Sequence, residues 1–158
     1  MELILSGDTL NVGRIAINNW YSGGTINTWT AGTGTDSVRL TAGNSTASGV
    51  FGFSAGKNNS NSGGYGTIVN GTGNTVSTAF GFIGNGKLNN VATIYGFIGN
   101  GSSNAITGSG SRGIIVGGKS NAVSGSYGLI VAGLNNQSQS TLSAIVSGNG
   151  NIIRGTFG

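Results

Sequence analysis

Residues 127–136 read Tyr-Gly-Leu-Ile-Val-Ala-Gly-Leu-Asn-Asn, and the order of residue types in this stretch returns along most of the chain. An isoleucine is followed three residues later by a glycine, and three residues after that by an asparagine. Successive isoleucines are fifteen residues apart, except for one step of seventeen between Ile98 and Ile115. They are Ile68, Ile83, Ile98, Ile115, Ile130 and Ile145. A short repeat of this kind is typical of a solenoid, whose coils bury their apolar faces only by stacking.

The glycine of each repeat predicts a sharp turn, because a residue without Cβ adopts positive φ at little cost. These turn glycines are Gly71, Gly86, Gly101, Gly118, Gly133 and Gly148. The asparagine is expected to enter the left-handed region and to bond its amide to the same amide one coil away, which predicts a structural ladder along the axis. The ladder residues are Asn74, Asn89, Asn104, Asn121, Asn136 and Asn151. A cation site on these amides is the weaker alternative, since the repeats lack acidic ligands.

The residues between these turns predict two strands per coil. Residues 127–132 suit a strand that is apolar on both faces. A second strand, with Val76, Val91, Ile106 and Val123 in register, is expected to face the isoleucines. The fold class is therefore all-β, a β-solenoid or β-roll of about fifteen residues per coil. Because a coil has only one interior, the outer apolar face predicts a neighbouring copy of the chain.

An aromatic column shares one phase of the repeat, and it allows two interpretations. Its members are Tyr65, Phe80, Tyr95, Tyr127 and Phe157. Plain hydrophobes lie beside these rings in the strands, which favours an interface between chains over a platform for saccharides. An ice-binding face is not indicated, because the regular Thr-x-Thr array that such a face needs is missing.

Composition argues against catalysis. The sequence has no His, no Cys and only three acids, Glu2, Asp8 and Asp36. A hydrolytic triad needs a base, a glycosidase needs two carboxylates, and zinc needs Cys or His ligands. We therefore predict no catalytic residue, no cofactor and no metal site. Disorder is not indicated either, although 33 residues are Gly and 6% are charged, because Ile, Val and aromatics recur at fixed phases.

The basic residues do not form a cluster in the sequence. Lys57, Lys87 and Lys119 share one phase of the repeat, which predicts a sparse basic row along one edge. We interpret these residues as solvated turn lysines and expect no nucleic-acid partner, since phosphate binding draws on several clustered cations. No membrane insertion is expected, because no stretch is long and apolar enough to span a bilayer. The first residues lack the basic region of a signal peptide, so synthesis in a cytoplasm is expected.

The first fifty residues differ from the repeats and carry a family resemblance. The run Gly7-Asp8-Thr9-Leu10-Asn11-Val12-Gly13-Arg14-Ile15-Ala16-Ile17-Asn18 resembles a short segment near the N-termini of many bacteriophage tail fibres and tailspikes. Residues 50–158 are similar to repeats of phage fibres and to the head repeats of trimeric autotransporter adhesins, which form trimeric β-rolls. The chain departs from those patterns at Gly84, Gly99 and Ser143, which replace the usual residues of their coils.

The resemblance implies a structural fibre protein of a bacteriophage virion, on its tail or its head, made in the host cytoplasm. Residues 1–34 would be a virion-docking segment, 35–49 a degenerate capping coil and 50–158 the solenoid. The implied docking residues are Leu10, Arg14, Ile17, Asn18 and Trp20. The implied partners are two further copies of the chain, in an intertwined or side-by-side homotrimer, and virion proteins at the N-terminus. Contact with a host-surface glycan or protein is left open.

The sequence is also compatible with two alternative functions: the head of a trimeric bacterial surface adhesin, and the non-catalytic part of a tailspike depolymerase. The end of the sequence adds a further expectation. Residues 154–158 break off where the Phe-Gly opening of another coil begins, and they include no cap for the strand edge. We therefore expect the native polypeptide to continue beyond Gly158 or to have lost a C-terminal folding domain.

Overall fold

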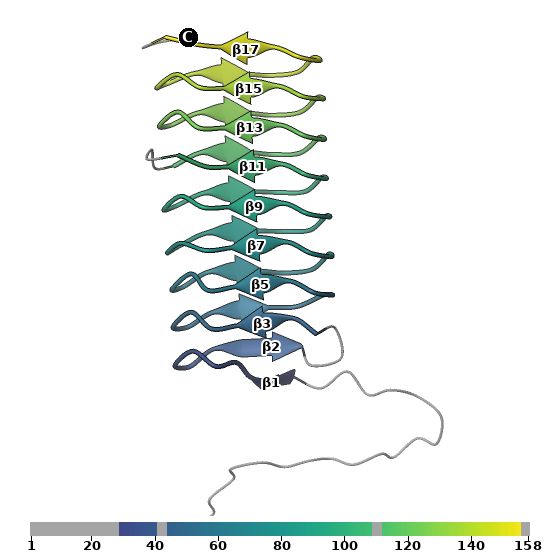
Figure 1. The fold of residues 1–158 in the computed structure, drawn as a ribbon, viewed down its shortest axis with the longest axis vertical. Coiled ribbons are helices and arrows are strands. Elements are labelled where there is room, and N and C mark those ends of the chain that lie inside the picture. Colours follow the sequence, from purple (N-terminus) through teal and green to yellow (C-terminus); the bar gives the residue numbers. More distant parts are fainter. Residues whose placement is uncertain (1–28, 41–43, 109–111, 156–158) are drawn as a thin grey trace, which may run out of the picture.

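The computed structural model describes residues 29–40, 44–108 and 112–155, and these residues form a stack of β-coils (Figure 1). The predicted all-β solenoid with coils of about fifteen residues is confirmed. None of the described residues is helical, so this part of the chain holds no helix that could cross a membrane. The expected docking residues and Phe157 lie outside the described residues.

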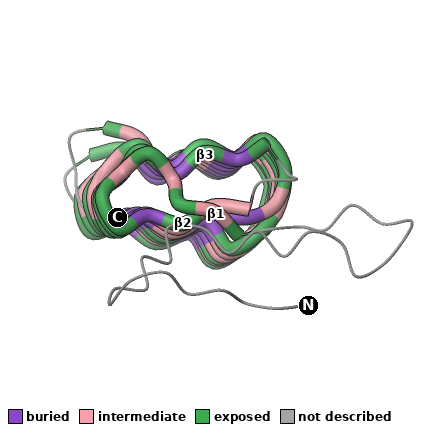
Figure 2. Tube along the Cα trace, turned by 90° about the horizontal axis from the view of Figure 1, so that it is seen from below, coloured by how far each residue is buried: buried purple, intermediate pink, exposed green. Residues whose placement is uncertain are grey.

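Two sheets of short strands face each other across the coil (Figure 2). The nine-stranded sheet contains β1 (Trp29–Ala31), β2 (Val38–Leu40), β4 (Phe53–Ser54), β6 (Thr67–Ile68), β8 (Phe82–Ile83), β10 (Phe97–Ile98), β12 (Ile114–Ile115), β14 (Leu129–Ile130) and β16 (Ala144–Ile145). The eight-stranded sheet contains β3 (Thr46–Ala47), β5 (Ser60–Asn61), β7 (Thr75–Val76), β9 (Asn90–Val91), β11 (Ala105–Ile106), β13 (Ala122–Val123), β15 (Gln137–Ser138) and β17 (Ile152–Ile153).

Neighbouring coils pair in parallel and in register, so that equivalent repeat positions stack directly. Ile98 pairs with Ile83 on one side and with Ile115 on the other. Parallel strands lie about 4.8 Å apart, which is the rise expected for each coil. The seventeen-residue coil keeps this register, because its extra length falls between β11 and β12.

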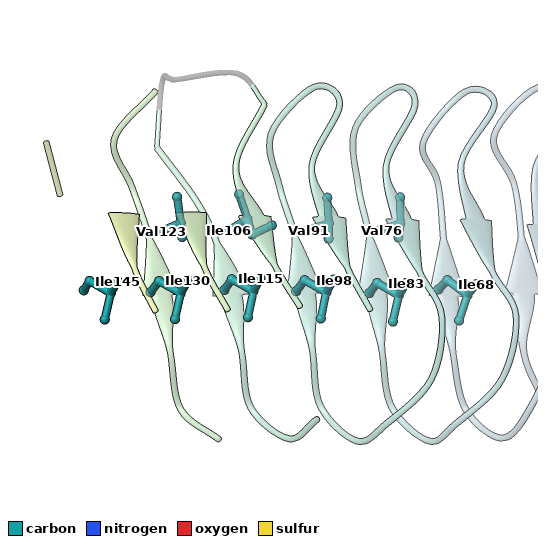
Figure 3. Packing of buried hydrophobic residues seen from close by; sticks show 10 residues of the cluster. All are labelled: Ile68, Val76, Ile83, Val91, Ile98, Ile106, Ile115, Val123, Ile130 and Ile145. Carbon is teal, nitrogen blue, oxygen red and sulfur yellow. The ribbon is translucent and has the colours of Figure 1, made fainter. Parts of the chain in front are cut away.

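The interior holds two facing columns of branched apolar side chains (Figure 3). The repeat isoleucines of the nine-stranded sheet make one column, and Val76, Val91, Ile106 and Val123 of the eight-stranded sheet make the other. Ile98 is completely buried. Burying a side chain of this size contributes about 1.5–3 kcal/mol. Since no single coil can enclose its isoleucine, the coils depend on one another for stability.

The interior becomes polar toward the N-terminal end. Arg39 and Ser54 occupy the positions of the isoleucine column, in register with Ile68. Asn61 occupies a valine position, where its amide donates to the carbonyl of Phe53 at 3.0 Å. Arg39 donates from Nη1 to the carbonyl of Ser45 at 3.3 Å. The first coils therefore carry polar side chains at interior positions, and those of Arg39 and Asn61 are hydrogen-bonded to backbone carbonyls.

The strand β1 closes the nine-stranded sheet at this end. It runs antiparallel to β2, with Trp29 opposite Leu40 and Ala31 opposite Val38. The Trp29 ring lies 5.1 Å from that of Phe53, centroid to centroid, on the outer side of the sheet. Residues 29–31, which belong to the segment 1–34, thus join the sheet. Residues 38–40 and 46–47 stack in register on the coil that follows.

The strands are shorter than the sequence predicts. The expected strand over residues 127–132 is limited to Leu129–Ile130. Tyr127 has φ of +56°, so its backbone is left-handed rather than extended. Aromatic residues favour strands in general. Here the coil must bend back toward the other sheet within a few residues, and the turn geometry overrides that preference.

Candidate interaction surface

The six repeat asparagines form one column inside the coils, and Asn89 shows the bonding pattern. Its backbone N–H and its Nδ2 donate to Oδ1 of Asn74, at 3.0 and 3.1 Å. Its Nδ2 also donates to the carbonyl of Gly101 in the next coil, at 3.0 Å. Its own Oδ1 accepts the backbone N–H of Asn104. Each buried amide thus joins three successive coils, and its hydrogen-bonding groups are already used inside the protein.

The column begins at Asn59, one coil before the six repeat asparagines. Asn59 lies below Asn74, and the hydroxyl of Ser45 takes over the acceptor role for Asn59 at 3.2 Å. At the other end Asn151 is exposed, although it bonds to Asn136 in the same way. This column is therefore a device that aligns the coils, and we assign it no ligand.

All six turn glycines have positive φ, from +95° at Gly118 to +122° at Gly148. The expectation that the ladder asparagines are left-handed is wrong. The left-handed residue is the one before each asparagine, for example Leu88 at +56° before Asn89. The asparagine must instead keep an ordinary backbone, because its amide points into the coil to reach the coils on either side.

An exposed column of mostly aromatic residues lies at the turns that lead from the eight-stranded to the nine-stranded sheet. These turns stack along one narrow edge of the solenoid (Figures 1 and 2). We call the column the aromatic edge. Its members are Phe51, Tyr65, Phe80, Tyr95, Arg112, Tyr127 and Leu142. From Phe51 to Tyr95 the rings stack on one another, with centroids 5.0–5.1 Å apart. Tyr65 is 54% exposed and Tyr95 49%.

Arg112 takes the place of a ring in this column. Its guanidinium lies between the rings of Tyr95 and Tyr127, 5.4 and 5.3 Å from their centroids. It also donates from Nη1 to the hydroxyl of Tyr127 at 2.7 Å. Sequence analysis missed Arg112 and Phe51 as members of the column. The step of seventeen residues was the available signal for Arg112, because it moves the equivalent position from residue 110 to residue 112.

Every residue of the aromatic edge has a left-handed backbone, with φ between +53° and +66°. For bulky residues this conformation costs on the order of 1–3 kcal/mol each, whereas Gly or Asn would adopt it more cheaply. The chain nevertheless places large side chains at this position in coil after coil. The physical reason for this strained backbone must lie in contacts that these side chains make beyond their own coil.

The outer face of the nine-stranded sheet adjoins the aromatic edge and is also apolar. Its outward side chains include Phe82 and Phe97, whose rings stack at 5.2 Å, followed by Ile114 and Leu129 in the same column. All but three of the exposed large hydrophobic residues in the described part of the chain lie on this side of the coil. They belong to the strands of this sheet, directly follow one of these strands, or lie in the turns that carry the aromatic edge. The exceptions are Leu88, Leu134 and Ile152.

The eight-stranded sheet has a different outer face. The first residue of each of its strands faces outward, and most of these residues are small or polar. They are Thr46, Ser60, Thr75, Asn90, Ala105, Ala122, Gln137 and Ile152. The described solenoid therefore has one apolar side and one polar side. Large exposed apolar patches are typical of interaction sites.

The opposite narrow edge carries the lysines. Lys57, Thr72, Lys87, Ser102, Lys119, Leu134 and Asn149 are joined in this order by parallel β-bridges from coil to coil. We call this column the lysine edge. All three lysines are exposed. The predicted basic row is therefore present, with a lysine in every second coil from Lys57 to Lys119.

The described residues contain no group of three His, Cys, Asp or Glu side chains that could hold a metal ion. No protein-family model, no curated protein and no solved structure matches this chain.

Proposed function

We propose that this chain is a structural fibre protein of a bacteriophage virion, in which three copies pack their apolar sides together and the N-terminal segment attaches the fibre to the particle. The observation that carries the proposal is the exposed apolar side, formed by the aromatic edge and the outer face of the nine-stranded sheet. Packing against further copies would remove these side chains from water. Cyclic closure would leave no apolar side open.

Three features support a structural role over a catalytic one. The interior is filled by the apolar columns and the asparagine ladder. The sequence contains neither His nor Cys. Stacked coils form a rod that lengthens by about 4.8 Å with each repeat, which is a suitable construction for a fibre. The assignment to a phage virion rests on the resemblance of residues 7–18 and 50–158 to phage fibres.

Sedimentation equilibrium of the full chain tests the assembly. We expect a folded trimer at low micromolar concentration. The double variant Phe80→Asn and Tyr95→Asn should raise the concentration of half-dissociation at least about tenfold, because each buried ring contributes about 1.5–3 kcal/mol and 1.4 kcal/mol corresponds to a factor of ten. Asparagine tolerates the left-handed backbone at both positions, so the coils should still fold.

Leu88→Asn is the matched control. Leu88 is also left-handed and 55% exposed, but it lies next to the lysine edge. Its replacement should leave the association unchanged. A wild-type chain that sediments as a folded monomer would overturn the proposed assembly, and so would an equal loss of association in the control and the double variant.

Immunogold labelling tests the location of the protein. An antibody against the full chain should label one site on purified phage particles. Deleting residues 1–24 should leave the oligomer folded and remove the label from the particles, since the implied docking residues lie in this segment. Label on bacterial cells but never on particles would instead favour the alternative of an adhesin head.

A further inference from the structure

The lysine edge has a charge spacing that is set by the fold. Lys57 and Lys87 are two coils apart, with Thr72 between them, and Lys119 follows two coils later, beyond Ser102. With about 4.8 Å per coil, the lysine backbones are about 9.6 Å apart. Backbone hydrogen bonds hold the column: the N–H of Lys87 donates to the carbonyl of Gly101 at 2.9 Å, and its carbonyl accepts the N–H of Ser103 at 2.9 Å.

The lysine charges are not neutralised by acids in the described part of the chain. Asp36 is the one acidic residue there. It follows Thr35, whose carbonyl accepts the N–H of Phe51, so it lies toward the aromatic edge. Most positions next to the lysine edge that carry a side chain offer an amide or a hydroxyl, and Leu88 is the apolar exception. The polar ones are Asn58, Ser103, Ser120 and Asn135. The edge thus combines evenly spaced cations with neutral hydrogen-bonding groups.

We propose that the lysine edge binds a linear acidic polysaccharide that lies along the solenoid axis, with an acid group on every second sugar. One sugar of an extended polysaccharide is about as long as one coil is high, so every second sugar would meet a lysine. The hydroxyls of the sugars between them would face Thr72 and Ser102. This inference rests on the proposed fibre function, because it names the surface partner of the fibre.

Two properties of the edge favour this ligand over nucleic acid. Duplex DNA carries one charge per about 1.7 Å of its axis, far denser than one lysine per two coils. Binding of single strands also draws on aromatic side chains beside the cations, and the aromatic edge lies on the other side of the coil. If the apolar sides meet in a trimer, three lysine edges remain available, and each can bind a polymer that lies along it.

Hyaluronan is a suitable probe, because every second sugar of this polymer carries a carboxylate. We expect the full chain to bind it in a salt-sensitive manner, and to bind neither dextran nor hyaluronan with esterified carboxylates. The triple variant Lys57→Gln, Lys87→Gln and Lys119→Gln should weaken binding at least about tenfold, since exposed ion pairs each contribute modestly and add up along a polymer. Binding is measured by biolayer interferometry.

A variant with the same net charge tests the spacing itself. Lys87→Ser combined with Ser102→Lys moves one charge by one coil and uses residue types that the column already contains. Weaker binding of this variant supports the proposal. Equal binding would overturn it, as would equal affinity of the wild type for a single-stranded oligonucleotide or for anionic vesicles. Sedimentation of the same samples separates this result from the fibre proposal: a trimer that ignores hyaluronan refutes the ligand alone.

Discussion

Replacing Gly118 by Val is expected to lower the free energy of unfolding by at least about 3 kcal/mol per chain, the upper end of the cost of a strained backbone. Gly118 has φ of +95°, which a β-branched residue adopts only under strain. A Cβ atom there would also overlap the carbonyl oxygen of Gly133 and lie 2.6 Å from Nδ2 of Asn121. The substitution therefore disturbs both the stacking of two coils and the asparagine ladder.

The adjacent Gly117→Val provides the matched control. A Cβ atom at Gly117 would meet no atom within 4 Å, and Gly117 is not among the residues with positive φ. We expect this variant to change stability by less than about 0.5 kcal/mol, as for other surface substitutions. Urea denaturation of both variants at one protein concentration makes the comparison. Similar midpoints would show that stacking at this turn tolerates a side chain.

The sequence allowed the interior to be predicted because each interior position demands one kind of chemistry. Ile98 fills a space that only its neighbours in the stack can close, and Asn89 satisfies groups in three coils. Gly118 sits where a Cβ cannot fit. Such requirements repeat with every coil, so they leave a periodic record in the sequence.

The aromatic edge was only partly predictable, because its backbone contradicts local preference. Propensity places Tyr127 in a strand, yet its φ is positive. Arg112 was not predicted as a member of the column for two reasons. The two extra residues of the seventeen-residue repeat shift its position in the repeat, and an arginine is not an expected residue type among stacked rings. Its place in the column follows from its contacts with Tyr95 and Tyr127, which are apparent only in the folded chain.

Departures from the repeat were visible in the sequence, but their compensation was not. Ser143 replaces the glycine at its phase, and Ser138 replaces the valine or isoleucine of the facing strand. The two hydroxyls are hydrogen-bonded to each other inside the coil, and Ser143 also donates to the carbonyl of Ser140. At the equivalent place in another coil, a Cβ on Gly81 would lie only 2.7 Å from a methyl group of Val76. The smaller Ser138 therefore makes room for Ser143.

The asparagine ladder leads to the second large prediction: Asn89→Ala should destabilise the chain by about 2–4 kcal/mol. The variant leaves the buried N–H of Asn104 without an acceptor and removes one of the two donors to the carbonyl of Gly101, which keeps the N–H of Lys87. A buried polar group that loses its only partner costs about 1–3 kcal/mol, and a further lost hydrogen bond about 0.5–1.5 kcal/mol. Because the ladder joins successive coils, the loss should also uncouple the coils on either side of Asn89.

Two further substitutions make the prediction for Asn89 specific. Asn90→Ala removes the same amide from the adjacent residue, which points outward between Thr75 and Ala105, so alanine already fits that column. Its cost should stay below about 0.5 kcal/mol. Asn89→Ser should recover part of the loss, because the Ser45 hydroxyl already accepts the N–H of Asn59 at the N-terminal end of the ladder. Urea midpoints should therefore fall in the order wild type and Asn90→Ala, then Asn89→Ser, then Asn89→Ala. If Asn90→Ala is as damaging as Asn89→Ala, the two faces of this strand do not differ as the hydrogen bonds indicate, and the ladder is not what holds the coils in register.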